Sequence, residues 1–129
     1  MGRMREGIAD VHQHTVLVVD DDLQVRRLFA DSLEPMGTTV RAAGSVDAAV
    51  AVARADPDVC VVLADVRMPG KDGWDLQREL RHVNPELPVV LLTADRLLSI
   101  RGTVLDKPIA ADDIAALIRR ACPHGRHAT

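Results

Sequence analysis

Three acidic side chains stand where they could bind a metal ion together. Asp20 and Asp21 directly follow the apolar run at residues 15–19, and Asp65 directly follows the apolar run at residues 59–64. Carboxylates about 4 Å apart repel by about 4 kcal/mol per pair at an effective dielectric of 20, so such a cluster needs a counterion. Carboxylate oxygens, with no His or Cys in the set, suit Mg²⁺. If the fold gathers the three residues at one edge, the sequence predicts a magnesium site there.

Two further polar side chains would complete an anion receptor. Thr93 follows the apolar run at 89–92, and Lys107 comes shortly after the run at 103–105. Lysine supplies a compact positive charge and threonine a hydroxyl donor. Next to them, Asp65 could attack a phosphoryl group and carry it as an acyl phosphate. Catalysis would then consist of positioning and charge neutralisation.

Short apolar runs alternate with segments of helical period, and this alternation would position the candidate residues. The runs predict strands at 15–19, 38–43, 59–64, 89–92 and 103–105. Apolar positions at three- and four-residue steps, Leu28 among them, predict helices at 25–36, 46–55, 74–83 and 111–121. We expect Asp22 and Ser45 to cap helices and Gly37 to end one. The pattern indicates a parallel α/β sheet covered on both faces, whose chemistry gathers at the carboxyl ends of the strands.

Composition limits the class of protein. The chain has 129 residues and a net charge of −3, and we expect one domain at 15–121 between loose ends at 1–14 and 122–129. Aromatic residues make up only 2%, which argues against a stacking platform for single-stranded nucleic acid. The mild negative charge argues against nucleic acid or an anionic membrane as a direct partner. The histidines, which lack metal-ligand spacing, are expected at the surface: His12, His14, His82, His124 and His127.

The two cysteines do not predict a disulfide framework. Cys60 lies inside an apolar run and is interpreted as a small buried hydrophobe, while Cys122 lies near the C-terminus. The first fifteen residues contain no apolar stretch of signal-peptide length, and no later run approaches a membrane span. A reducing, cytoplasmic setting is therefore expected.

Four motifs, in this order, resemble those of receiver domains from two-component response regulators. They are VLVVDDD (Val16–Asp22), LADVRMPGKDGW (Leu63–Trp74), LLTA (Leu91–Ala94) and DKP (Asp106–Pro108). The resemblance runs from about Thr15 to Ala121. It implies a doubly wound, five-stranded parallel sheet of flavodoxin-like order 2-1-3-4-5. Within the second motif, we give residues 68–70 and 72–73 only the role of turn residues.

The resemblance also implies roles for individual residues. Asp65 would be the phosphate acceptor. Mg²⁺ (or Mn²⁺) would be held by Asp20, Asp21, Asp65 and the backbone carbonyl of Arg67. The phosphoryl group would be bound and sensed by Thr93, Ala94 and Lys107. A histidine kinase or a phosphotransfer protein would donate the phosphate, and a single-domain receiver of this kind would signal through contacts with a downstream protein, catalysing only its own phosphotransfer and dephosphorylation.

Two features depart from the family pattern. Receivers usually carry Tyr or Phe three residues before the lysine, and Val104 stands there instead. Only the nine residues 94–102 separate Thr93 from the strand expected near Thr103. A parallel crossover usually takes about a dozen residues or more, so the fourth helix is predicted to be truncated or absent. The face that reports phosphorylation in the family would therefore differ here.

Two other functions stay open from the sequence. The first is a constitutive interaction module that retains the site while its output face ignores phosphorylation. The second is an aspartate-nucleophile phosphatase of the haloacid dehalogenase type, for which the pair Asp20 and Asp22 is superficially suited. Its nucleophile would be Asp20 instead of Asp65, and Gln24 stands where that pattern expects Thr or Val.

Overall fold

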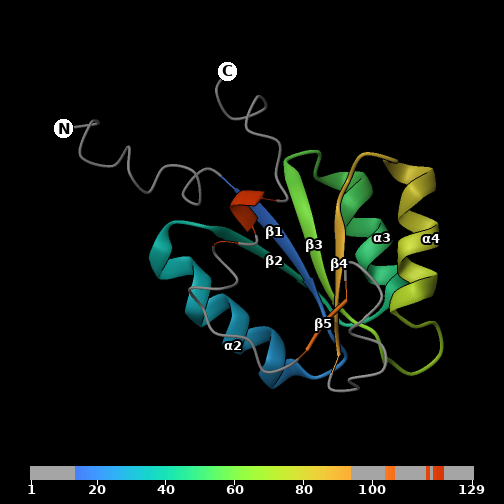
Figure 1. Cartoon of the computed structure of the whole chain (residues 1–129), viewed down its shortest axis with the longest axis horizontal. Coiled ribbons are helices and arrows are strands. Elements are labelled where there is room, and N and C mark those ends of the chain that lie inside the picture. Colours follow the sequence, from blue (N-terminus) through green and yellow to red (C-terminus); the bar gives the residue numbers. More distant parts are fainter. Residues whose placement is uncertain (1–13, 94–103, 107–115, 117, 121–129) are drawn as a thin grey trace.

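The protein folds as a five-stranded parallel sheet with helices on both faces (Figure 1). The computed structural model describes residues 14–93, 104–106, 116 and 118–120. Its strands are β1 (Thr15–Val19), β2 (Thr39–Ala43), β3 (Val59–Asp65), β4 (Val89–Thr93) and β5 (Val104–Asp106). Every neighbouring pair is parallel, and the order is β2-β1-β3-β4-β5. The predicted α/β class and flavodoxin-like order are confirmed.

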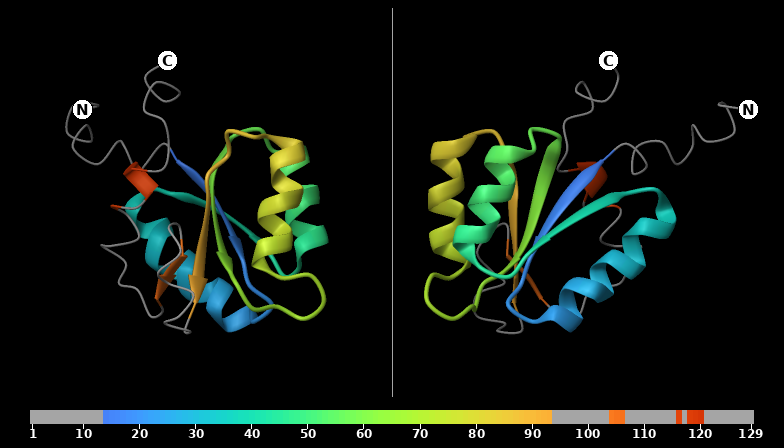
Figure 2. Two further views of the ribbon diagram at one scale, coloured as in Figure 1. Left: turned by 45° about the vertical axis from the view of Figure 1, so that its right-hand side comes forward. Right: turned by 180° about the vertical axis from the view of Figure 1, so that it is seen from behind.

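Helices cover the sheet from two sides. The described part of the chain contains α2 (Leu23–Leu33), a short 3₁₀ helix η2 (Glu34–Met36), α3 (Val46–Ala55) and α4 (Gly73–Val83). Helices α3 and α4 lie side by side on one face, and α2 covers the opposite face (Figure 2). Residues 116 and 118–120 are helical, within the segment predicted as the last helix. The rest of that segment and the crossover at 94–102 lie outside the described residues.

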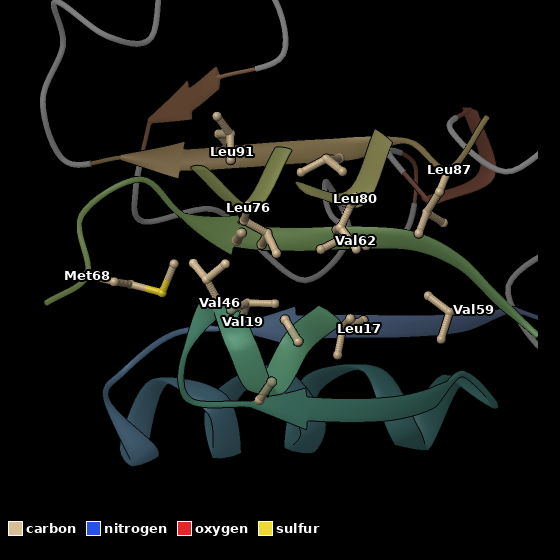
Figure 3. Packing of buried hydrophobic residues seen from close by; sticks show 14 of the residues in the cluster. Leu17, Val19, Val46, Val59, Val62, Met68, Leu76, Leu80, Leu87 and Leu91 are labelled. Atoms are coloured by element: carbon tan, nitrogen blue, oxygen red, sulfur yellow. The ribbon is translucent and has the colours of Figure 1, made fainter. Parts of the chain in front are cut away.

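Two apolar clusters hold the helices against the sheet. On the α3 and α4 face, Leu17 and Val62 pack with Leu76 and Leu80 (Figure 3). The opposite cluster, which includes Ile118, holds α2 through Leu33. Consecutive residues of a strand point to opposite faces, so a strand buried on both sides must be apolar throughout. Each fully buried leucine contributes about 1.5–3 kcal/mol of transfer free energy.

Side-chain caps begin two of the helices, and a glycine ends a third, at the predicted residues. Asp22 accepts a hydrogen bond from the Gln24 backbone N–H at 2.9 Å and so caps α2. Ser45 caps α3 by accepting from Ala48 at 3.2 Å. Gly37 ends η2 with a φ of 90°, a left-handed conformation that glycine adopts without steric penalty. The expected caps at Asp22 and Ser45 and the stop at Gly37 are confirmed.

Two sequence predictions of burial are wrong. Leu28 was expected on the packed stripe of α2 but is 65% exposed, because that helix faces the sheet through Phe29 and Leu33. His14 was expected at the surface but is buried, and its backbone carbonyl accepts a hydrogen bond from the Thr39 N–H at 3.0 Å. His14 therefore directly precedes β1 within the packed structure.

Cys60 differs from its expectation as well. It is buried in β3, as predicted, but its sulfur belongs to a disulfide bond. The sequence holds one other cysteine, Cys122, which lies outside the described residues. The spacing of cysteines in a sequence does not by itself reveal whether they form a disulfide bond.

Among the helices that the structure describes, none is both long enough and apolar enough to cross a lipid bilayer.

A charged pair ties the edge strand β2 to the end of α3. Asp56 accepts hydrogen bonds from the Arg41 Nε–H and from the Asp58 backbone N–H, each at 2.9 Å. The Asp58 N–H, followed by the Arg41 guanidinium, holds the pKa of the Asp56 carboxyl below its ordinary value of 3.8. Because the pKa is lowered in the folded state, this stabilisation is present above the unfolded-state pKa and is lost as the pH falls through the folded-state pKa.

We therefore expect Asp56→Asn to lower the free energy of unfolding by about 1 kcal/mol at pH 7. The difference from the wild type should shrink as the pH falls below about 4. Urea unfolding at pH 7, 5 and 3 measures this. Asp58→Asn makes the same change of charge at an exposed side chain and should have a smaller effect. A deficit for Asp56→Asn that is the same at pH 3 and pH 7 would contradict the assignment.

Candidate functional site

The carboxyl ends of β1 and β3 bring the three predicted carboxylates together. Val19 pairs with Ala64 in the sheet, so the residue after each, Asp20 and Asp65, stands at the same edge. The candidate ligand oxygens of Asp20, Asp21 and Asp65 all lie within 4.8 Å of one another. Residues more than forty positions apart in the sequence therefore form one acidic cluster.

Asp20 is the most tightly held member of this cluster. Its side chain is buried, and its Oδ1 accepts a hydrogen bond from the Asp22 N–H at 2.9 Å. Its backbone N–H donates to the carbonyl of Ala43 at 3.1 Å, and its own carbonyl accepts from Arg26 Nη1 at 2.7 Å. Asp21 is exposed and Asp65 is half-buried. The cluster is therefore open to solvent on the side of Asp21.

The first residues of the loop after β3 are held in place by hydrogen bonds and by packing. The Val66 N–H donates to the Leu92 carbonyl at 3.0 Å, which extends the contact of β3 with β4 beyond Asp65. The Arg67 N–H donates to Asp65 Oδ1 at 3.1 Å. Met68 is buried in the apolar cluster on the α3 and α4 face of the sheet (Figure 3). These contacts limit the directions that the Asp65 carboxylate can take.

The start of α4 packs directly against the backbone of Asp65. Asp72 caps α4 by accepting from the Asp75 N–H, and Asp75 accepts in return from the Asp72 N–H, which forms a capping box. A Cβ atom on Gly73 would lie 2.7 Å from the Asp65 carbonyl oxygen and 2.9 Å from Val66 Cα. Both neighbours are backbone atoms, so only glycine allows this approach. The turn role predicted for Asp72 and Gly73 agrees with these contacts.

An ion-pair network connects the same loop to two helices. Lys71 Nζ lies 2.9 Å from Asp47 Oδ1 and 3.0 Å from Glu79 Oε2. Asp47 lies in the first turn of α3 and Glu79 lies in α4. Hydrogen bonds from Lys71 to Asp47 and then to Glu79 raise the pKa of the lysine. Lys71 is exposed, so these ion pairs contribute little to the free energy of unfolding. Their main effect is to orient the loop.

The donor set of the acidic cluster fits a hard divalent cation. All three side chains offer carboxylate oxygens, which Mg²⁺ prefers, and no nitrogen or sulfur ligand belongs to the cluster. At 4.8 Å, two carboxylates repel by about 3 to 4 kcal/mol at an effective dielectric of 20. A bound divalent cation would remove this repulsion. The Arg67 carbonyl, predicted as a further ligand, belongs to the residue whose N–H contacts Asp65.

Two of the remaining predicted site residues, Thr93 and Val104, lie in β4 and β5. Thr93 is the last residue of β4 and pairs with Asp106, the last residue of β5. Lys107 directly follows Asp106 in the sequence, and both Lys107 and Ala94 lie outside the described residues. Val104 begins β5 and pairs with Leu91. The sheet register thus places the carboxyl end of β4 next to that of β3, and the carboxyl end of β5 next to that of β4.

The comparisons with known proteins agree with this geometry. The family model of the response regulator receiver domain matches residues 16–119. The chain belongs to the response regulator receiver family. Receivers of two-component systems are phosphorylated and bind Mg²⁺ as a rule.

Several relatives are full-length regulators. The C4-dicarboxylate transport transcriptional regulatory protein DctD of Rhizobium meliloti is 35% identical over 115 residues, which cover 83% of this chain and 25% of that protein. Response regulator MprA of Mycobacterium leprae is 39% identical over 113 residues, which cover 81% of this chain and 49% of that protein. This receiver therefore spans about a quarter to a half of the curated relatives it matches.

Solved structures show the same fold. A response regulator receiver domain protein from Clostridium thermocellum superposes with a TM-score of 0.77 at 25% identity, covering 90% of this chain and 99% of that one. The chemotaxis protein CheY4 of Vibrio cholerae superposes with a TM-score of 0.74 at 23% identity, covering 84% of this chain and 98% of that one. The second likeness concerns the fold alone.

Sequence reasoning missed two residues that contact the site. The sequence pattern assigned no role to Arg26 or to Gly44. In the structure, the Arg26 guanidinium contacts the Asp20 carbonyl and lies against Gly44. A glycine at the end of the strand next to β1 was the available signal, because glycine often marks a close approach.

We expect Gly73→Ala to disturb the cluster. The new Cβ would collide with the backbone of Asp65 and Val66, so the β3–α4 loop must move. Unfolding free energy should fall by about 1–3 kcal/mol, as for other overpacked sites. Mg²⁺ affinity, followed by NMR shifts of the Asp65 and Arg67 amides, should fall with it.

Gly70→Ala is the control for this prediction. Its φ of 77° strains any other residue, but a Cβ there meets no atom within 4 Å. Its stability should fall by about 1 kcal/mol, while Mg²⁺ affinity should stay near that of the wild type. Equal losses of Mg²⁺ affinity in the two variants would contradict the importance of the contact between Gly73 and Asp65.

Proposed function

We propose that this receiver accepts a phosphoryl group on Asp65 in a Mg²⁺-dependent reaction. The donor would be a phosphohistidine of a histidine kinase or of a phosphotransfer protein. The observation that carries the proposal is the convergence of Asp20, Asp21 and Asp65 within 4.8 Å at the carboxyl edge of the sheet. Family membership supports the same reaction class.

The reaction requires little covalent chemistry from the protein. A carboxylate oxygen of Asp65 forms the new bond to phosphorus, while the bond from phosphorus to the donor imidazole breaks and its electron pair stays on the leaving nitrogen. Asp20, Asp21, Asp65 and the Arg67 carbonyl would hold Mg²⁺, which when bound neutralises charge on the carboxylate and the phosphoryl oxygens. The half-buried position of Asp65 allows a donor to approach while its carboxylate stays oriented by the Arg67 N–H.

Thr93 and Lys107 would bind the transferred phosphoryl group on the side away from Asp20 and Asp21. Thr93 ends β4 next to β3, and Lys107 follows the end of β5. Lysine would bind one phosphoryl oxygen as a point charge, and the threonine hydroxyl would donate to another. We propose that the resulting state is read in the cytoplasm through contacts with a downstream protein. No direct contact with nucleic acid or membrane is included in this proposal.

Intact-mass spectrometry tests phosphorylation directly. We expect the wild type to gain one phosphoryl group from a small phosphodonor such as acetyl phosphate in the presence of Mg²⁺, and to gain none with excess EDTA. Asp65→Asn should remain unlabelled, whereas Asp58→Asn, a distant exposed change of the same kind, should be labelled like the wild type. Peptide mapping then locates the label. A label on Asp20 would support the phosphatase alternative, and an unlabelled wild type would end the proposal.

A second candidate function is favoured by the strand arrangement. Val104 occupies the position at which receivers usually carry an aromatic ring, and it lies in β5 paired with Leu91. Only ten residues, 94–103, separate β4 from β5, one more than the sequence pattern predicted. A parallel crossover usually takes about a dozen or more. These features favour an interaction module whose partner contacts do not depend on phosphorylation.

Amide hydrogen exchange separates the two candidates. For a switching receiver, adding beryllofluoride with Mg²⁺ should change protection in residues 94–105. For a constitutive module, changes should be confined to the site itself, at residues 20–22 and 65–67. Asp65→Asn with the same additions controls for effects of the reagent, because it lacks the acceptor carboxylate.

A further inference from the structure

Arg26 places a positive charge directly behind the acidic cluster. It lies in the first half of α2, one turn after the cap Asp22, and it is half-buried. Its Nη1 donates a hydrogen bond of 2.7 Å to the backbone carbonyl of Asp20. A guanidinium is always charged near neutral pH, so this bond is charge-assisted and stronger than one between neutral groups.

The same residue, Asp20, is also held at its backbone N–H and at one carboxylate oxygen. The Asp20 N–H donates to Ala43, its Oδ1 accepts from Asp22, and its carbonyl accepts from Arg26. The first and last of these bonds fix the peptide planes on either side of the Asp20 Cα. Its side chain then leaves the backbone in one direction, toward Asp21 and Asp65.

Gly44 provides the space that Arg26 occupies. A Cβ atom on Gly44 would lie 2.8 Å from Arg26 Nη1 and 3.5 Å from Cζ. The clash involves the tip of a flexible side chain, and the φ of Gly44 is not in the left-handed region, so alanine would displace the guanidinium while straining little else. The requirement for glycine at this position therefore comes from Arg26.

We propose that Arg26 is a positioning residue of the metal site and that Gly44 is the space it requires. Arg26 would act through the Asp20 peptide and would not itself bind the metal or the phosphoryl group. It holds the Asp20 peptide in the orientation that aims the carboxylate at the shared site, and its charge offsets part of the repulsion within the cluster. The inference deepens the proposed function, because it rests on Mg²⁺ binding by Asp20, Asp21 and Asp65.

Mg²⁺ titrations followed by NMR amide shifts test the effect on affinity. Loss of a residue that orients a ligand typically weakens metal binding 10- to 100-fold, so we expect Arg26→Met to bind Mg²⁺ at least about tenfold more weakly. Gly44→Ala should weaken binding as well, by displacing the guanidinium. The double variant should be no weaker than Arg26→Met, since both changes act through one contact. Arg26→Lys, which keeps the positive charge and can still donate a hydrogen bond, should recover part of the affinity.

The metal-free protein gives an independent readout. The Asp22 N–H donates to the Asp20 carboxylate, so its amide shift and its exchange rate report how that carboxylate is oriented. We expect Arg26→Met and Gly44→Ala to change both quantities without any Mg²⁺ present. Arg27→Met is the matched control: it removes the same charge from the next, exposed residue of α2 and should leave the Asp22 amide and the Mg²⁺ affinity nearly unchanged.

The outcomes separate this inference from the proposed function. If the wild type binds Mg²⁺ and Arg26→Met binds it equally well, the inference is overturned while the proposed function stands. If Arg27→Met weakens binding as much as Arg26→Met, the effect is one of overall charge and positioning is rejected. If the wild type does not bind Mg²⁺, the proposed function fails, and so does a metal-site role for Arg26. Should Arg26→Met not fold, Gly44→Ala with Arg26 retained carries the same test.

Discussion

The repulsion among three carboxylates at one edge of the sheet is the constraint on which the rest of this structure depends. Asp20, Asp21 and Asp65 present oxygens within 4.8 Å of one another, an arrangement of like charges that is unfavourable without a counterion. A fold keeps such a cluster only when rigid elements on either side oppose its separation. The paired ends of β1 and β3, buried on both faces, supply that rigidity.

Backbone donors and one cation offset part of that repulsion before any metal binds. The N–H groups of Asp22 and Arg67 donate to two of the carboxylates, and Arg26 donates to the carbonyl of Asp20. Glycines make these approaches possible where a side chain would collide, at Gly44 beside Arg26 and at Gly73 beside Asp65. Each of these contacts also orients an oxygen. The contacts that stabilise the cluster therefore also shape the candidate metal site.

The β5 side of the site is where this chain departs from the pattern expected of a receiver. Strand β5 is short and begins with Val104, which pairs with Leu91 at a position where the family usually has an aromatic ring. Valine has no ring whose rotation could follow a threonine hydroxyl. In the proposed function, the ends of β1 and β3 carry the acidic residues that the reaction needs. The β5 side carries valine in place of the expected ring and follows a crossover of ten residues.

Local sequence determined the elements and the composition of the site. Uninterrupted apolar runs predicted β1 and β3, capping residues predicted the starts of α2 and α3, and acidic residues after the runs predicted the cluster. These signals need only near neighbours along the chain. Tertiary structure decided the burial of His14, the disulfide at Cys60 and the contact of Arg26 with Gly44, because each depends on distance between segments remote in sequence. Periodicity predicts which residues can face a core, but only packing decides which of them are buried, as exposed Leu28 shows, and which atoms meet there.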